Sequence, residues 1–301
     1  KLISHESKKS GIKYSLRLLP IGGYVKMAGE DEESADPNAL GTKPAWQRFI
    51  IIASGSFMNL LFGVVVMFML VSTAKSLPTN IIRGYHTDYE VKSNDKLLPG
   101  DRIIKVDGAR VHIGNEVVYE IMRNGIKPID ITVKRNGEII TVSDVEFPVI
   151  TDGGQKLGLP DFRLVTDDSP GIITIFEHSY FRSVSTIRMI WQSLFDLLSG
   201  RFGFEAVSGP VGVTGAIGEA AGESFPDLVY LAVVISMNLG IFNLLPIPAL
   251  DGGRLVFILI EMVRRKPINP KYEGYVHFVG IVLLLTLMAL VTFKDIASLI
   301  K

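Results

Sequence analysis

Residues 243–254 read NLLPIPALDGGR, and this stretch decides how the chain folds. It follows the uncharged segment 228–242, which is apolar enough to enter a lipid bilayer. Prolines and glycines break the helix here and expose backbone polar groups, which lipid cannot satisfy but a buried cavity can. A carboxylate such as Asp251 is costly in hydrocarbon, so its position indicates a metal, proton or ion site. The alternative is a helix cap, with Asp251 solvated in a loop outside the membrane.

The composition favours a membrane protein. Hydrophobic residues make up 48% of the 301 residues, and 31 basic side chains are balanced by 31 acidic ones. Because there is no basic excess, we expect no nucleic-acid partner. The chain has no cysteine, so disulfides are excluded and any metal must be held by His, Asp, Glu or Asn.

Three uncharged segments are long enough to cross a hydrocarbon core, which takes about 20 helical residues. They are residues 49–74, 228–250 and 275–293, and the second continues into a broken helix that extends to residue 265. Basic residues are concentrated before the first span and in the loop between the second and third spans. By the positive-inside rule both regions are cytoplasmic, and the long region between the first two spans lies outside.

The outer region contains a soluble module, residues 80–166, that reads as short alternating strands. Asp107-Gly108 and Asn136-Gly137 each separate two such strands, which is typical of β-hairpins. Residues 115–123 are the only stretch with a helical pattern.

Residues 97–108, LLPGDRIIKVDG, closely resemble the signature of PDZ domains. PDZ domains bind extended peptides by adding a strand to a sheet edge. On this resemblance the peptide groove is expected at Leu97, Leu98, Pro99 and Gly100. The alternative is a spacer that only crowds the entrance to the membrane site.

Two further segments are expected at the membrane without spanning it. Within residues 1–48, on the cytoplasmic side, the alternating segment 14–27 predicts a two-stranded hairpin around Pro20-Ile21-Gly22-Gly23. Within residues 180–227, apolar side chains recur at helical spacing over 184–198, which suits a helix lying on the membrane surface. Packing against the outer module is the alternative for that stripe. Gly209-Pro210-Val211-Gly212 then predicts a turn toward the membrane.

Four features together resemble the site-2 protease family of intramembrane zinc metalloproteases, in its bacterial regulator-of-sigma-E protease branch. They are the Asn-Leu-Leu-Pro…Asp-Gly-Gly segment, the sequence LLPIGGYVKM at 18–27, the PDZ module between spans, and Gly-Pro-Val-Gly. The match covers nearly the whole chain in the family's order. It implies a polytopic α-helical membrane protein of the bacterial cytoplasmic membrane, with a membrane re-entrant β-hairpin and an inserted PDZ (α+β) domain.

The family's zinc site needs a His-Glu-x-x-His helix, with the Glu as general base. The sequence has no such motif, because His5-Glu6 is followed by Lys9 where the second His belongs. His277, near the start of the third span, is interpreted as a packing or snorkelling residue. We expect the motif helix, which carries the catalytic Glu, to lie upstream of residue 1.

The resemblance implies zinc-dependent hydrolysis of peptide bonds within the membrane, with Asp251 as a ligand of the Zn²⁺. Asn238 and Asn243 are candidates for holding the substrate backbone, and interhelical hydrogen bonding is the alternative. An unwound substrate strand would pair with the hairpin at Ile21, Gly22, Gly23, Tyr24 and Val25. The expected substrates are single-pass membrane proteins, such as anti-sigma factors, or signal peptides in the bilayer.

Two other classes remain open at this point. A catalytically inactive membrane PDZ scaffold would use the outer module to recruit partners and bind no metal. A transporter is the second, since broken helices with Asn and Asp also build ion sites. The three spans and the lack of an internal repeat argue against a transporter.

Overall fold

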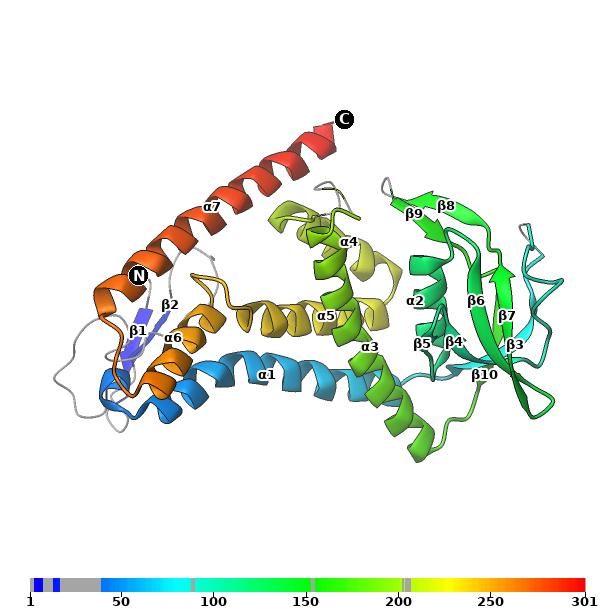
Figure 1. Ribbon diagram of the computed structural model, residues 1–301, viewed down its shortest axis with the longest axis horizontal. Coiled ribbons are helices and arrows are strands. Elements are labelled where there is room, and N and C mark those ends of the chain that lie inside the picture. Colours follow the sequence, from blue (N-terminus) through cyan, green and yellow to red (C-terminus); the bar gives the residue numbers. More distant parts are fainter. Residues whose placement is uncertain are drawn as a thin grey trace. The chain divides into compact units, whose positions relative to one another are not determined.

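The computed structural model describes residues 3–7, 13–16, 39–87, 90–152, 155–201, 203 and 207–300. The chain divides into two compact units, residues 1–48 and 49–301, and each is considered by itself (Figure 1). In the first unit β1 (Ile3–Glu6) pairs antiparallel with β2 (Lys13–Leu16), and a short 3-10 helix covers Leu40–Thr42. The predicted hairpin at 14–27 lies outside the described residues, apart from 14–16 in β2.

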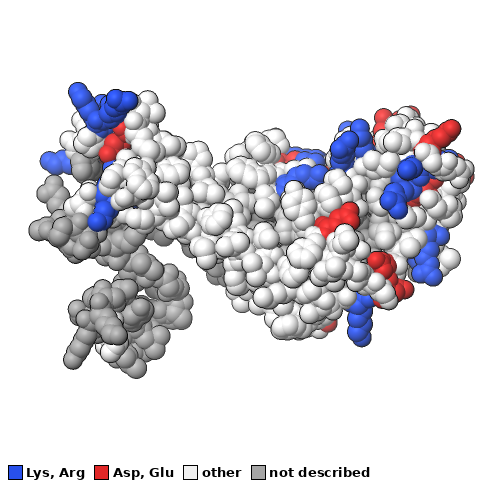
Figure 2. Space-filling model, turned by 90° about the horizontal axis from the view of Figure 1, so that it is seen from below, with Lys and Arg blue, Asp and Glu red and all other residues white. Residues whose placement is uncertain are grey.

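Within the described part of the chain, three helices are long and apolar enough to cross a membrane: α1 (Ala45–Ser72), α5 (Phe225–Asn243) and α7 (Pro270–Ile300). They coincide with the three predicted spans in place, length and hydrophobicity, with different ends, and their crossing of a membrane stays a prediction. The second ends at Asn243 instead of residue 250, because the two prolines that follow lack the N–H groups that would continue a helix. On the face shown in Figure 2, a broad uncharged surface separates groups of charged side chains, as contact with lipid requires.

Helices α1 and α5 pack closely through small residues. A Cβ added at Gly240 would lie 2.9 Å from the carbonyl oxygen of Ser56, so no larger residue fits there. The Ser236 hydroxyl donates to the Asn59 carbonyl oxygen at 2.9 Å. Such contacts hold membrane helices together, because the hydrophobic effect gives no preference for protein over lipid.

Between α1 and α3 the chain forms a β domain. Its main sheet is antiparallel, in the order β10-β3-β4-β6-β7, and a two-residue strand β5 pairs with β4. The strands of this sheet are β3 (Leu77–Tyr85), β4 (Arg102–Val106), β5 (Ala109–Arg110), β6 (Ile129–Arg135), β7 (Glu138–Val145) and β10 (Phe162–Asp167). A separate pair, β8 (Val149–Asp152) and β9 (Gln155–Gly158), precedes β10.

Both predicted hairpins are present, β4–β5 and β6–β7, and their turn residues have left-handed φ angles. One helix, α2 (Gly114–Asn124), completes the domain. Apolar side chains of the main sheet and α2 form one buried core, which includes Ile103, Val117, Ile121 and Ile131. Burial of these residues supplies most of the domain's stability.

Helix α3 (Ile172–Leu198) is amphipathic, with its polar side facing the protein and its apolar side exposed. Its polar face, which includes Ser183, Thr186 and Asp196, is buried in the protein. Large apolar side chains on the opposite side are exposed, among them Ile173, Phe176, Tyr180, Val184, Trp191, Phe195 and Leu198. No other part of the described protein covers this apolar stripe. An exposed apolar face of this kind is typical of a helix that contacts lipid.

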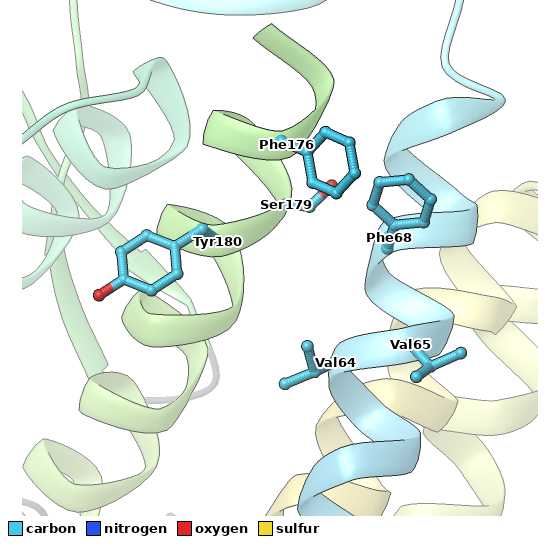
Figure 3. Close-up of a pocket in the computed structure, with 6 residues that line it drawn as sticks. All are labelled: Val64, Val65, Phe68, Phe176, Ser179 and Tyr180. Atoms are coloured by element: carbon cyan, nitrogen blue, oxygen red, sulfur yellow. The ribbon is translucent and has the colours of Figure 1, made fainter. Parts of the chain in front are cut away.

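The exposed stripe continues into an apolar groove between α3 and α1, of about 330 Å³. Figure 3 shows Phe176 of α3 facing Phe68 of α1, and their ring centroids lie 4.9 Å apart. The start of α3 therefore packs against α1, one of the helices long and apolar enough to cross a membrane.

The segment Gly209-Pro210-Val211-Gly212 is not the turn that the sequence predicts. Pro210 is the first residue of α4 (Pro210–Glu223), with Gly209 as the N-cap. Proline is favoured at a first helical position, because its fixed φ suits the helix and the missing N–H has no partner there anyway.

Candidate functional site

Asp251 is the first residue of α6 (Asp251–Arg264), directly after the loop 244–250 that ends the second span. The side chain is half-buried. Its carboxylate reaches toward α1, since Oδ2 lies 4.0 Å from the position of a Cβ added at Gly55. A negative charge in the first turn of a helix is stabilised by the helix dipole. The structure thus places an acidic group at a helix break next to a membrane span.

The two glycines after Asp251 let the loop fold back over the start of α6. A Cβ added at Gly252 would lie 2.1 Å from the Leu245 carbonyl oxygen, and one at Gly253 would lie 2.6 Å from that of Ile247. Both values are far below van der Waals contact, so any side chain at either glycine would displace the loop. The Asp-Gly-Gly sequence is therefore a packing requirement of this loop.

The loop also contacts α7. The backbone N–H of Ala249 donates to Nδ1 of His277 at 3.1 Å, and a Cβ added at Gly280 would lie 2.5 Å from the Cβ of Pro248. Neither α7 residue is predicted from the sequence as part of the site. An isolated His and a Gly within an apolar helix carry no local signal beyond the position of His277 near the start of a span.

As a metal centre the described residues are incomplete. Across the part of the chain that the structure describes, no three His, Asp or Glu side chains lie close enough to hold a metal ion together. Among the candidate site residues from the sequence, Asp251 has the chemistry of a zinc ligand, since carboxylate oxygens are accepted at catalytic zinc sites. The two motif histidines that the resemblance implies are not among the 301 residues.

The candidate substrate-binding residues are only partly placed. Asn238 and Asn243 lie in the last turns of α5, where Asn238 is exposed and Asn243 is half-buried. Asn243 ends the helix just before the loop that leads to Asp251. The hairpin positions 21–25 lie outside the described residues.

The predicted peptide groove lies in the turn before β4. Leu97 is fully buried in the domain core, and its carbonyl oxygen accepts a hydrogen bond from the Tyr85 hydroxyl. The Leu98 N–H donates to Asp101, whose carboxylate also accepts two bonds from Arg135. The open edges of the sheet are β10 and β7, so this turn does not border an edge to which a peptide strand could add. The peptide groove at 97–100 stays a prediction from the resemblance.

A charged interface joins the β domain to α3. Arg123 of α2 makes two hydrogen bonds to Asp196 of α3, at 2.9 and 3.0 Å. Tyr119 donates to Gln192 at 2.9 Å, and burial raises the pKa of Tyr119 to about 12. Arg188 Nη2 lies 3.0 Å from Glu120 Oε1 without hydrogen-bond geometry, so charge attraction and not a directed bond links them.

Comparison with known proteins agrees with these features. The model of the family described as Peptidase family M50 matches residues 1–287. The regulator of sigma-W protease RasP of Bacillus subtilis is 34% identical over 374 residues, covering 97% of this chain and 88% of that protein. The zinc metalloprotease RasP of Bacillus licheniformis is 28% identical, covering 97% of this chain and 88% of that protein. The RasP protein of Geobacillus kaustophilus is also 28% identical, with 96% and 87% covered. The chain therefore belongs to peptidase family M50, which confirms its resemblance to the site-2 proteases.

Proposed function

We propose that this metalloprotease of the membrane cuts peptide bonds inside the bilayer, with Asp251 as one ligand of a catalytic zinc ion. The observation that carries the proposal is the position of Asp251, at a helix break that directly follows a membrane-spanning helix. A dication offsets the cost of holding a carboxylate in an apolar environment. Relatives named zinc metalloproteases support zinc as the cofactor.

Zinc, when bound, would polarise the scissile carbonyl and lower the pKa of a bound water. The residues of this chain would position the metal-binding carboxylate and the substrate. The Asp-Gly-Gly turn holds the Asp251 carboxylate at the start of α6, and Gly55 leaves the space in front of it free of a side chain. Asn243, the last residue of α5, directly precedes this loop and would hydrogen-bond the backbone of an unwound substrate.

The proposed substrates are membrane-embedded segments, as in anti-sigma factors or signal peptides. The named relative from Bacillus subtilis is a regulator of sigma-W, which supports the first class. We place the protein in the bacterial cytoplasmic membrane, with the β domain, proposed as a PDZ domain, on the outer side. The charge distribution of the loops supports that orientation.

The position of the cut tests this function. The full-length protein would be reconstituted in liposomes with a single-pass substrate, and the products would be mapped by mass spectrometry. We expect a cut inside the substrate's hydrocarbon stretch that is abolished by a zinc chelator. Cuts confined to the soluble flanks of the substrate would show that the protein is not an intramembrane protease.

The role of the hairpin is a prediction from the sequence. Tyr24→Pro removes a backbone N–H from a strand that would pair with the substrate. We expect cleavage to fall at least about tenfold, the equivalent of one lost bond of about 1.4 kcal/mol, with zinc content unchanged. Full activity at normal expression would exclude strand pairing at this position.

A further inference from the structure

The loop that presents Asp251 contains a strained residue. Ala249 has a φ of 78°, a left-handed angle that costs a residue with a Cβ about 1–3 kcal/mol. Such a conformation persists only where the surrounding structure enforces it. The loop's own backbone bonds, Leu250 N–H to Ile247 and Ile247 N–H to Leu245, are local. They set the turn but do not tie it to another helix.

His277 supplies a tie to another helix. Its Nδ1 accepts the Ala249 N–H at 3.1 Å, across 28 residues of sequence. The acceptor role of Nδ1 assigns the proton of the neutral ring to Nε2, and Glu273 Oε1 lies 4.0 Å from that atom. Phe257 of α6 lies beside the ring, with centroids 5.9 Å apart. The imidazole is therefore directed at the loop by the Ala249 hydrogen bond, with Phe257 and Glu273 beside it.

The backbone of α7 lies against the same loop one turn further along. A Cβ added at Gly280 would lie 2.5 to 2.7 Å from the Cβ, carbonyl carbon and carbonyl oxygen of Pro248. Two of these three atoms are backbone, so a side chain at Gly280 could be accommodated only by moving the loop. His277 and Gly280 lie three residues apart, which places them on one face of α7.

We propose that His277 is a positioning residue, which holds Ala249 in its left-handed conformation and thereby fixes Asp251 at the start of α6. Gly280 provides the close approach that lets His277 reach the loop. The inference rests on the proposed role of Asp251 as a zinc ligand. It assigns His277 no contact with the metal or the substrate, and it replaces the interpretation of His277 as a snorkelling residue.

The test measures zinc affinity of the full-length protein by competition with a chromophoric chelator. His277→Leu keeps the volume and removes the acceptor, and we expect a loss of about 10- to 100-fold in affinity. His277→Asn places a side-chain oxygen near the position of Nδ1 and should recover most of that loss. Gly280→Ala should weaken zinc binding, and Gly274→Ala, where an added Cβ meets no atom within 4 Å, should not.

Asp251→Ala, measured in parallel, separates the two claims. If Asp251→Ala binds zinc normally, the proposed function fails whatever His277 does. If Asp251→Ala loses zinc while His277→Leu keeps wild-type affinity, only the positioning role is overturned. A His277→Asn variant as weak as His277→Leu would also overturn it, because the acceptor alone would then not account for the effect.

Discussion

At the scale of single residues, α2 carries two buried carboxylates that face Arg188 of α3. Glu116 and Glu120 are almost completely buried on adjacent turns. Burial raises the pKa of Glu120, and the charges of Arg188 and Arg123 oppose this only in part. Ionising Glu120 thus costs more in the folded than in the unfolded protein, and this destabilisation develops as the pH rises from the ordinary pKa of a glutamate to the raised one.

We therefore expect Glu120→Gln to raise the melting temperature at about pH 8, and the difference from wild type to shrink toward about pH 5. The reason is that glutamine keeps the shape of the neutral acid and cannot ionise. Differential scanning fluorimetry of the full-length protein across this pH range measures the effect. Glu138→Gln, at an exposed hairpin position, is the control and should show no such trend. A variant less stable than wild type at about pH 8 would contradict the prediction.

Asp251 could be singled out from the sequence as a candidate, because an acid between prolines and glycines after an apolar span is costly unless it binds a metal, a proton or an ion. His277 and Gly280 could not. Their importance comes from contacts with residues 28 and 32 positions earlier, which no local pattern reveals. A signature such as the one that includes Leu97 likewise identifies a segment but does not show which strand forms a sheet edge.

At the scale of elements, α7 links two parts of the chain. Near its start it contacts the loop before Asp251, and near its end Asp295 caps α4. The N–H groups of Gly209 and Gly212 both donate to Asp295 Oδ2, at 2.9 and 2.8 Å. A Cβ added at Gly209 would lie 2.9 Å from the same oxygen, so the small residue admits the carboxylate.

Asp295→Ala should loosen the start of α4, because two backbone N–H groups lose their acceptor. At about 1–3 kcal/mol for unsatisfied groups, hydrogen exchange of residues 209–213 should accelerate roughly 5- to 150-fold. Mass spectrometry of peptides covering α4 measures this change. Gly215→Ala, on the same helix with open space around it, should not accelerate exchange, since alanine favours the helix more than glycine does. Unaltered protection in Asp295→Ala would show that the cap does not hold α4.

The spans were predictable because length and hydrophobicity alone define them. The exact ends of α5 and α7 were not predictable. The end of α5 depends on the prolines in the loop 244–250, and the ends of α7 depend on local packing. Gly209-Pro210 could be read as a turn or as a helix start. The deciding partner, Asp295, lies 86 residues away in sequence.

At the scale of the whole molecule, the β domain is an insertion between α1 and α3 whose ends meet. Leu77 of β3 and Asp167 of β10 are cross-strand partners, so its two ends lie side by side. A Gly-Ser linker of a few residues can therefore replace residues 80–166 without stretching the chain. Leu77 should be kept, because it packs with Met67 and Val71 of α1.

If the domain filters substrates by the size of their outer part, this deletion should let untrimmed substrates be cut. We expect cleavage of a substrate with an intact outer domain to rise at least about tenfold, while a pre-trimmed substrate is cut as before. A deletion protein that retains zinc but cuts neither substrate would show that the domain recruits substrates and does not exclude them.

The central claim is that Asp251 binds the catalytic zinc, and metal content measures it most directly. The full-length protein and its Asp251→Asn variant would be purified in the same detergent and analysed for zinc by mass spectrometry. Asp227→Asn, which alters an acid in the first turn of α5, is the matched control. We expect about one zinc per chain in wild type and Asp227→Asn, and a loss of most zinc in Asp251→Asn. Equal zinc in all three proteins would contradict the account.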